Sequence, residues 1–541
     1  MAAVSRNLVE LVRRHHEQGA PTALDVLKEA MDRRGEITDD DRRVAAERSG
    51  LPEAAVYGVS TFYEDLLVPH GSRHVRVCTG TACFAATADA HVETVKRALN
   101  LELNQRSDDK SVSLAETVCL GYCHASPAVR DGDTIDAGPG AIERLLADAT
   151  TPAPEPGFTS LLAEPVLTRP GDWSGFTQAR ELDPAELIAI VKEANVRGRG
   201  GAGFPAGVKW EFAARAANPD KVIVANGDEG DAGSYIDKLL MEENPHLLLE
   251  GMALAGHAVG ARHGFILTRS EYPRSKPALD NAIEQARAQG HLGEHFDVYV
   301  VEGAGSYVVG EETALLACLQ GLRGTVSARP PFPAERGVHG HPTVVNNVET
   351  LCNIPFIARE GASAYKALSP NGTPGSKLVC FNERFARPGA YEVPFGMTVR
   401  ELCEDVAGGM DGPIKALQIG GPLGGILPGA KLDTVFDFDP LAAEGCMVGH
   451  GGIVGFDAHT DMRAVATHLL RFGAAESCGK CFPCRIGLQR AHAMFAAPDP
   501  VDRTRLEALL ETLEVGSLCA HGGGIPAPIR SILAHWPEEL A

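Results

Sequence analysis

The sequence lacks any uninterrupted run of 18 or more apolar residues, so it predicts no membrane-spanning helix. Its first residues, MAAVSRNLVELVRRHHEQG, lack the apolar core and the small-residue cleavage site of a secretory signal. Basic residues are scarce, because 50 Lys and Arg stand against 71 Asp and Glu and give a formal net charge of −21. Nucleic-acid binding requires a basic surface. We therefore expect a cytoplasmic protein with no nucleic-acid partner and no direct membrane insertion.

The length of 541 residues exceeds what a single hydrophobic core organises, so several domains are expected. Helical periodicity runs through residues 1–60, and the proline-rich stretch TTPAPEPG at 150–157 has the composition of a linker. The patterning predicts an α/β multidomain chain with these parts: a small α/β domain with a helical N-terminal extension at 1–150, a linker at 151–182, a ligand-binding α/β domain at 183–365, a β-rich domain at 366–457 and a helical domain at 458–541.

Cysteines are clustered near the C-terminus. The stretch ESCGKCFPCRIG contains Cys478, Cys481 and Cys484, and GSLCAHGGG supplies Cys519 as a fourth candidate. Three thiolates on one tight loop with a fourth from elsewhere are typical of a [4Fe–4S] cluster. Zinc more often takes two separated pairs of ligands. The spacing therefore predicts one [4Fe–4S] site.

Two further cysteine pairs lie in the N-terminal part. Cys78 and Cys83 are spaced C-x4-C, and Cys119 and Cys123 are spaced C-x3-C. Two pairs from separate loops suit a [2Fe–2S] cluster, with two thiolates on each iron. They also suit zinc, which often binds two such pairs. The spacing favours iron–sulfur and leaves zinc open.

The stretch VRGRGGAGFPAGVKWEF matches the G-x-G-x-x-G pattern at Gly198, Gly200 and Gly203. A dinucleotide-binding turn of the Rossmann type requires a strand directly before these glycines. Here the helical pattern DPAELIAIVKEAN precedes them instead. What remains is a backbone-amide cradle flanked by cations such as Arg199 and Lys209, suited to a phosphate-bearing ligand. The alternative is a purely structural loop.

Polar side chains gather at three other positions of the same domain. They follow a predicted strand in VANGDEGD, a glycine-rich turn in EGAGSYVVGEETALL and a predicted strand in PTVVNNVETL. Loops after strands often contact ligands, and acidic side chains there bond ribose hydroxyls and repel a 2′-phosphate, which favours NAD over NADP. The alternative for each carboxylate is a helix cap. The candidates are Asn226, Asp228, Glu229, Asp231, Tyr307, Glu311, Glu312, Asn346 and Asn347.

Two iron–sulfur sites beside a phosphate-binding domain indicate an electron-transfer protein. Hydride donors deliver two electrons, whereas clusters accept them one at a time. A flavin cofactor performs that conversion.

Taken together, the motifs resemble a known family. GRGGAGFPAGVKW, NGDEGD, SEYP, GAGSYVVGEETAL, RPPFPA, PTVVNNVETL and SCGKCFPCRIG resemble the NADH-binding subunit of respiratory complex I, which carries FMN and a [4Fe–4S] cluster. Residues 1–150, with VYGVSTFYEDL and the two cysteine pairs, resemble its thioredoxin-like [2Fe–2S] subunit. The β-rich stretch resembles a ubiquitin-like β-grasp domain that binds soluble ligands. The resemblance assigns the N-terminal pairs to iron and implies a Rossmann-like FMN and NADH domain and a C-terminal helical bundle around the [4Fe–4S] cluster.

The resemblance also implies roles for individual residues. Catalytic roles fall to Asp231 and Glu312, and Phe212 would stack on NAD(H). The implied cofactor-binding residues are Gly198, Arg199, Gly200, Gly201, Gly203, Lys209, Phe212, Asn226, Asp228, Glu229, Tyr307, Glu311, Asn346 and Asn347. The chain departs from the family in having Asp231–Ala232 in place of Glu–Pro, and Arg329 in place of Lys. The first change affects contacts on the nicotinamide side of the site. The second keeps the positive charge but changes the shape of the cationic group.

A fusion of these two subunits is typical of soluble NAD-dependent formate dehydrogenases and of bidirectional NAD-linked hydrogenases. The resemblance therefore implies a diaphorase subunit, closest to the β subunit of a formate dehydrogenase. Its partner would be a separate catalytic subunit, either a molybdenum or tungsten formate dehydrogenase α subunit or hydrogenase subunits. The alternatives are the diaphorase of a hydrogenase, a complex I-type NADH dehydrogenase and a non-catalytic iron–sulfur redox sensor.

Overall fold

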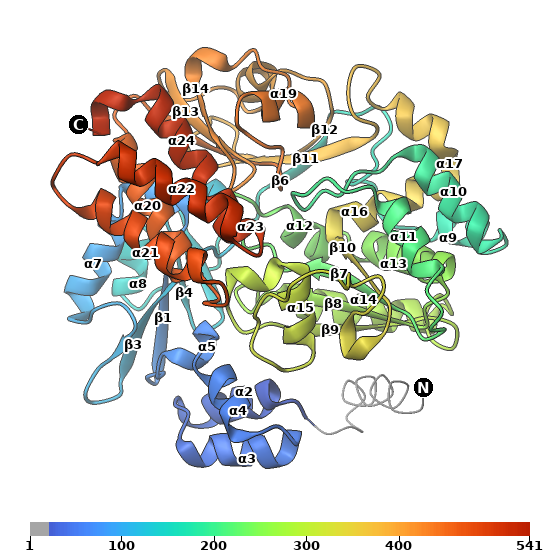
Figure 1. The fold of residues 1–541 in the computed structure, drawn as a ribbon, viewed down its shortest axis with the longest axis horizontal. Coiled ribbons are helices and arrows are strands. Elements are labelled where there is room, and N and C mark those ends of the chain that lie inside the picture. The colour runs from blue at the N-terminus through green and yellow to red at the C-terminus, as the bar shows by residue number, and fades with distance from the viewer. Residues whose placement is uncertain (1–20, 541) are drawn as a thin grey trace.

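The computed structural model describes residues 21–540, so the first predicted helix, RNLVELVRRHH, lies outside the described residues. Three sheets form the framework, and the C-terminal helices pack beside the N-terminal sheet (Figure 1). Within the described residues, no helix is both long enough and apolar enough to cross a membrane.

The N-terminal part begins with short helices, which are α2 (Ala23–Arg34), α3 (Asp39–Ser49), α4 (Glu53–Ser60) and α5 (Glu64–Leu67). The hydroxyls of Thr22 and Thr38 cap α2 and α3, each in a reciprocal capping box with an aspartate three residues on. Leu24, Leu27 and Val59 share a core with the strands and helices of residues 222–345. The helical extension therefore covers one face of the sheet of the next domain, although the sequence grouped it with residues 61–150.

The first sheet has the order β2-β3-β1-β4-β5. Its strands are β1 (Arg73–Cys78), β2 (Gln105–Arg106), β3 (Val112–Thr117), β4 (Ala128–Asp131) and β5 (Thr134–Ala137), and its helices are α6 (Thr81–Thr87), α7 (Ala90–Leu99) and α8 (Ala141–Leu146). β1 runs parallel to β3 and antiparallel to β4. This mixed sheet with flanking helices is the predicted thioredoxin-like domain.

Residues 151–182 are not a free linker. They contain β6 (Gly157–Ser160), which pairs with a strand of the third sheet, and α9 (Ser174–Ala179). Val166, Leu167 and Trp173 are buried in the main core. The proline-rich composition of 150–157 predicted a linker because it carries almost no apolar side chains, whereas the apolar residues that anchor the segment follow it.

The second sheet is parallel throughout, in the order β10-β7-β8-β9. Its strands are β7 (Val222–Gly227), β8 (His263–Thr268), β9 (Asp297–Glu302) and β10 (Thr343–Asn347). Its helices are α10 (Pro184–Ala194), α11 (Ala206–Ala214), α12 (Ile236–Glu243), α13 (Pro245–Val259), α14 (Ser275–Ala288), α15 (Glu312–Leu319), α16 (Val348–Cys352) and α17 (Ile354–Ala367). A parallel sheet is buried on both faces. This is the Rossmann-like domain that the sequence predicted.

The third sheet has the order β14-β13-β15-β11-β12-β6. Its remaining elements are β11 (Ser376–Phe381), β12 (Gly389–Pro394), α18 (Val399–Glu401), β13 (Ile414–Ile419), β14 (Ile426–Pro428), α19 (Phe438–Ala443) and β15 (Gly452–Asp457). A helical bundle completes the chain with α20 (Met462–Ala475), α21 (Phe482–Ala496), α22 (Arg503–Gly516), α23 (Ala520–Gly524) and α24 (Pro526–His535). The predicted β-rich and helical parts are therefore both present.

Candidate functional site

The glycine-rich loop lies between two helices, α10 and α11, as the sequence predicted, and not after a strand. Its two limbs are joined where Gly198 N donates to Phe204 O at 3.0 Å and Ala206 N donates to Val196 O at 2.9 Å. Gly201 and Gly203 have φ of +119° and +64°, a region that side chains disfavour. The loop is therefore a defined hairpin of backbone amides.

This loop sits against the carboxyl ends of two neighbouring strands. Asn226 and Asn347 are direct partners in the parallel register of β7 and β10. Arg199 N donates to the Thr350 hydroxyl at 2.8 Å, and the Thr350 amide donates to Asn347 Oδ1 at 3.1 Å. A Cβ on Gly200 would lie 2.9 Å from the Cβ of Asn347. Loop and sheet edge thus form one wall, in which Thr350 is a contact that the sequence analysis missed.

The side chain of Arg199 does not serve this wall. Its guanidinium is buried and donates to the Tyr365 hydroxyl at 3.0 Å and to Pro374 O at 3.2 Å, above the ring of Phe395. The sequence predicted a cation flanking the glycines, but this one turns into the protein interior. Only its backbone remains with the loop.

Arg197 supplies a cation beside the loop, with its Nε donating to Gly203 O at 3.1 Å. Lys209 supplies another. Its Nζ donates to Val345 O at 2.9 Å and lies 3.4 Å from Glu312 Oε2. Arg329 holds the other oxygen of Glu312 at 2.7 Å, so the family departure at this position keeps its ion pair. The three charges form a partly exposed row beside the start of α15.

Two other predicted carboxylates are helix caps. Glu311 accepts hydrogen bonds from Thr313 N and Ala314 N at the start of α15. Glu229 is fully buried and accepts from Ile236 N at 2.7 Å and Lys238 N at 3.0 Å at the start of α12. For these two residues the structure shows the capping alternative, although Oε1 of Glu311 is buried, has no hydrogen-bond partner among the described residues and lies 3.5 Å from the Arg329 guanidinium.

Asp228 differs from them. It is buried, and its Oδ2 has no hydrogen-bond partner within the part of the chain that the structure describes. Burial raises its pKa to about 8, although the nearby Arg269 lowers it. Its backbone N donates to Asn226 Oδ1 at 3.1 Å, which places it at the end of β7. An unpaired carboxyl oxygen at a strand end is free to meet a ligand.

The remaining predicted residues take part in hydrogen bonds around this edge. Tyr307 donates its hydroxyl to Asp231 Oδ1 at 2.7 Å. Asn346 Oδ1 accepts from the indole of the buried Trp210 at 2.9 Å, so this amide is oriented by α11. Asn226 Nδ2 donates to Gly310 O at 2.8 Å.

Large aromatic side chains are exposed near the loop. Phe212 on α11 is 58% exposed, as a stacking surface requires. Phe204 in the loop is 48% exposed, and Phe332, three residues after Arg329, is 57% exposed. The sequence analysis named only Phe212. Phe204 and Phe332 are identified by their exposure, because exposed apolar patches often mark binding surfaces.

These features fit a flavin mononucleotide. The hairpin of amides and Lys209 suit a phosphate. The unpaired Asp228 oxygen and the asparagines at the ends of β7 and β10 offer hydrogen bonds to the polar edges of ribityl and ring groups. The residues present therefore fit the group that the sequence predicted.

The four N-terminal cysteines are buried together. Cys119 Sγ lies 3.6 Å from Cys123 Sγ, and the charges of Cys78 and Cys83 are among the causes that raise the pKa of Cys123, after its hydrogen bond with Cys119 and burial. Gly121 N donates to Cys119 Sγ at 3.4 Å. Within residues 21–540, no three of these sulfurs lie within 4.8 Å of one another. Four ligands of one zinc ion at about 2.3 Å would be that close. The arrangement fits a [2Fe–2S] cluster.

The C-terminal cysteines gather where α21 and α23 begin. Cys481 is the N-cap of α21, Cys484 lies in its first turn and Cys519 is the N-cap of α23. The Ser477 hydroxyl lies 3.1 Å from Cys484 Sγ. Cys478 and Cys484 are buried, whereas Cys481 and Cys519 are partly exposed. Three thiols on one loop with a fourth from another helix fit a [4Fe–4S] cluster with one edge near the surface.

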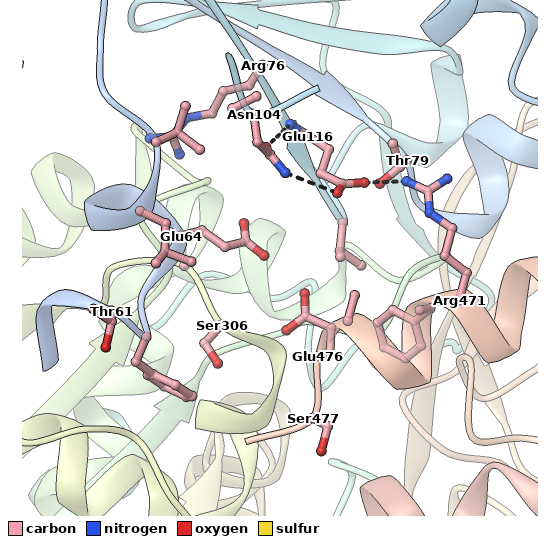
Figure 2. Close-up of a pocket in the computed structure, with 18 of the residues that line it drawn as sticks. Thr61, Glu64, Arg76, Thr79, Asn104, Glu116, Ser306, Arg471, Glu476 and Ser477 are labelled. Carbon is pink, nitrogen blue, oxygen red and sulfur yellow. Dashed lines mark hydrogen bonds and ion pairs between the residues drawn. The ribbon is translucent and has the colours of Figure 1, made fainter. Parts of the chain in front are cut away.

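A cavity of about 470 Å³ lies between the two cysteine sites and away from the glycine-rich loop. Figure 2 shows Glu64 and Glu476 facing each other across it, with Arg471 beside Glu116. Burial and the charge of Glu476 raise the pKa of Glu64 well above its usual value. The cavity is a charged space at the junction of the domains.

Comparison with known families gives three matches. Residues 9–146 match the thioredoxin-like [2Fe-2S] ferredoxin family. Residues 191–356 match the Nuo51 FMN-binding domain. Residues 464–541 match the NADH-ubiquinone oxidoreductase-F iron-sulfur binding region. The chain therefore has an FMN-binding domain, a [2Fe–2S] ferredoxin domain and a [4Fe–4S] region, as the sequence analysis predicted.

Individual proteins are similar over most of their length. The second NADH-quinone oxidoreductase F subunit of Rhizobium meliloti (strain 1021) is 40% identical over 376 residues, which are 66% of this chain and 89% of that protein. The HndC subunit of the NADP-reducing hydrogenase of Solidesulfovibrio fructosivorans is 39% identical over 381 residues, 68% of this chain and 78% of that protein.

A solved structure extends the similarity to nearly the whole chain. A chain of an NAD+-reducing [NiFe]-hydrogenase in the H2-reduced state superposes with a TM-score of 0.87 at 30% identity, over 96% of this chain and 92% of that one. The α/β multidomain architecture predicted from the sequence is confirmed. The chain thus belongs to the family of NADH-quinone oxidoreductase F subunits, and a thioredoxin-like [2Fe–2S] domain is joined to it in the same polypeptide.

Proposed function

We propose that this chain is a diaphorase subunit that exchanges electrons between NAD(H) and iron–sulfur clusters through FMN. The observation that carries the proposal is the wall formed by the glycine-rich loop and the ends of β7 and β10, beside the unpaired carboxyl of Asp228. When bound, FMN accepts a hydride from NADH and releases its electrons singly. The chain's own residues bind and orient the two nucleotides.

Several of the predicted residues have a task in this proposal. Lys209 neutralises the flavin phosphate, and Asp228 and Asn226 bond the polar groups of the flavin. Phe212, with Phe204, offers a flat apolar face for the dinucleotide. Glu312, which is fixed by Lys209 and Arg329, accepts from ribose hydroxyls and repels a 2′-phosphate, so NAD is favoured over NADP.

The partner is a separate catalytic subunit that carries its own iron–sulfur cluster. Exposed apolar side chains surround the [4Fe–4S] ligands, namely Phe482, Ile486, Val515 and Leu518. Val515 is 82% exposed, and the partly exposed Cys481 and Cys519 lie among these residues. Apolar surface around a cluster edge suits a partner that must bring a second cluster close.

The comparisons support some partner types better than others. The similar proteins named above belong to a quinone oxidoreductase and to hydrogenases, and the hydrogenase chain matches both fused parts. They support a hydrogenase or complex I-type partner better than the formate dehydrogenase assignment predicted from the sequence. Elemental analysis of the native complex separates these: nickel supports the hydrogenase, and molybdenum or tungsten supports the formate dehydrogenase instead.

The diaphorase activity itself is tested on the isolated chain. We expect NADH to bleach the flavin absorbance and to drive reduction of an artificial acceptor such as ferricyanide. Formate and hydrogen should not, because the reaction centre for either lies on another subunit. A chain that binds both clusters but no flavin would contradict the proposal and favour the redox-sensor alternative.

A further inference from the structure

His450 joins two parts of the protein that are distant in sequence. It lies between α19 and β15 of the β-rich domain, and its side chain enters the Rossmann-like domain. Its Nδ1 is 2.8 Å from Asp231 Oδ2, and its Nε2 is 3.0 Å from Asp237 Oδ2. The side chain is 10% exposed. A buried imidazole thus bridges two aspartates of the acidic loop and α12.

The geometry defines the charge of this histidine. An ionised carboxylate only accepts hydrogen bonds, and a neutral imidazole has a single N–H. Both ring nitrogens therefore donate to these carboxylates only in the imidazolium; Asn347 Nδ2 also lies 3.3 Å from Nε2. Although burial lowers the pKa of His450, the hydrogen bonds to Asp231 and Asp237 raise it well above its usual value.

The other charged groups around His450 agree with a positive ring. One carboxylate oxygen of Glu229, one of Asp237 and a ring nitrogen of His450 all lie within 4.8 Å of one another. On the opposite side, Lys377 Nζ donates to the backbone carbonyl of His450 at 2.7 Å and is paired with Glu349. The ring therefore faces three carboxylates, and Lys377, which contacts the backbone of His450, is itself paired with Glu349.

A metal ion at this place is disfavoured by the bonds already made. Glu229 Oε1 accepts from Ser234 Oγ at 2.5 Å and Ile236 N at 2.7 Å, and Oε2 accepts from Lys238 N. These donors occupy both lone pairs of Oε1 and one of Oε2, so Glu229 keeps a single lone pair for an ion. A proton held between His450 and the aspartates needs no additional ligand, whereas a metal ion does.

His450 connects the wall formed by the glycine-rich loop and Asn347, called here the Asn347 wall, with a second wall formed by Asp231 and Tyr307, called the Tyr307 wall. On one side, Asp237 Oδ2 also accepts from Asn347 Nδ2 at 2.6 Å, and Asn347 leads through Thr350 to the glycine-rich loop. On the other side, Asp231 accepts from Tyr307. The β-rich domain thus reaches both walls through one side chain.

We propose that His450, held as an imidazolium between Asp231 and Asp237, is a positioning residue that fixes the Tyr307 wall and the Asn347 wall of the flavin pocket relative to each other. This inference rests on the proposed function. When His450 loses its proton at high pH, one ring nitrogen stops donating and the hydrogen-bonded link between Asp231 and Asp237 is broken, while each aspartate keeps its other donor, Tyr307 or Asn347. FMN affinity should therefore be constant at low pH and fall as the pH rises through the pKa of His450.

The test measures the dissociation constant of FMN for the flavin-stripped full chain from pH 6 to 10. We expect His450→Gln to weaken FMN binding at least tenfold at pH 7 and to abolish the loss of affinity at high pH, because glutamine has no titrating proton. The matched control is His257→Gln, since His257 bonds the Leu182 carbonyl at 3.1 Å and touches no carboxylate in the described contacts. It should retain the affinity and pH profile of the parent chain.

Iron content and thermal unfolding show whether His450→Gln folds. If it does not, a second variant keeps the test informative. In Asp231→Asn, the new amide donates to Nδ1 of a neutral ring while Nε2 donates to Asp237, so both bonds survive loss of the proton and the fall of affinity at high pH should disappear. Unchanged FMN binding by His450→Gln at every pH would overturn the positioning role while leaving the proposed function intact. A stoichiometric divalent ion that disappears in His450→Gln would overturn it in favour of a metal site. A parent chain that binds no FMN would overturn the proposed function itself.

Discussion

The approach of Gly200 to Asn347 gives the sharpest expectation for the flavin pocket. In Gly200→Ala, the new Cβ lies 2.9 Å from the Cβ of Asn347, a distance that cannot be relieved by turning a flexible side chain. Displacements of this kind cost about 1–3 kcal/mol. Because about 1.4 kcal/mol is a factor of ten in affinity, FMN binding should weaken by roughly 5- to 150-fold. Gly200 is exposed, so in the flavin-free chain the loop moves away from Asn347 and the free energy of unfolding should change little. FMN binding requires the loop back against Asn347, so the cost falls on the affinity.

The assay is a fluorescence titration of the flavin-stripped chain with FMN, with iron content measured in parallel. Gly157→Ala is the matched control, because a Cβ there meets nothing within 4 Å and the residue lies in β6, outside the pocket. The variant at Gly200 should lose flavin while both variants keep both clusters. Equal FMN affinity in the two variants would refute the idea that the loop and Asn347 form one wall.

Three further predictions concern single side chains. Lys377→Met leaves the fully buried Glu349 without its partner, which should lower the free energy of unfolding by about 3–5 kcal/mol in chemical denaturation. Adding Glu349→Gln should restore most of this loss. No loss in the single variant would contradict the buried pair. The pKa of Asp228 is raised from 3.8 to about 8, so the flavin-free chain should lose stability as pH rises between these values, and a melting temperature in Asp228→Asn with the same pH dependence would contradict this. Cys481→Ser should remove the electron paramagnetic resonance signal of the [4Fe–4S] cluster and keep that of the [2Fe–2S] cluster; loss of both would contradict independent sites.

Features carried by short stretches of sequence were predictable. The helical pattern before the glycine-rich loop excluded a Rossmann turn, and α10 is found there. This helix start was predictable because the capping aspartate and the proline that follows it specify it locally. The cysteine spacings grouped the thiols correctly, since three ligands on one loop need no knowledge of the rest of the fold.

Local patterns misled where a side chain had two possible partners. Arg199 alternates with the glycines, which suggested a phosphate contact, but its guanidinium reaches Tyr365 across the domain. Glu311 and Glu229 occupy helix starts, and their caps use the carboxylates that the motif assigned to a ligand. A sequence shows that a charge is present, and only packing shows which way it points.

Periodicity and motif spacing, together with the family resemblance, were sufficient for the fold class and for the two kinds of cluster, because the motifs consist of residues that are close in the chain. The tertiary structure decided what depends on distant segments. The helices of residues 23–67 cover the second sheet, residues 151–182 complete the third, and His450 meets Asp231 across 219 positions. No local pattern carries these contacts, because each arises from burying one domain's surface against another.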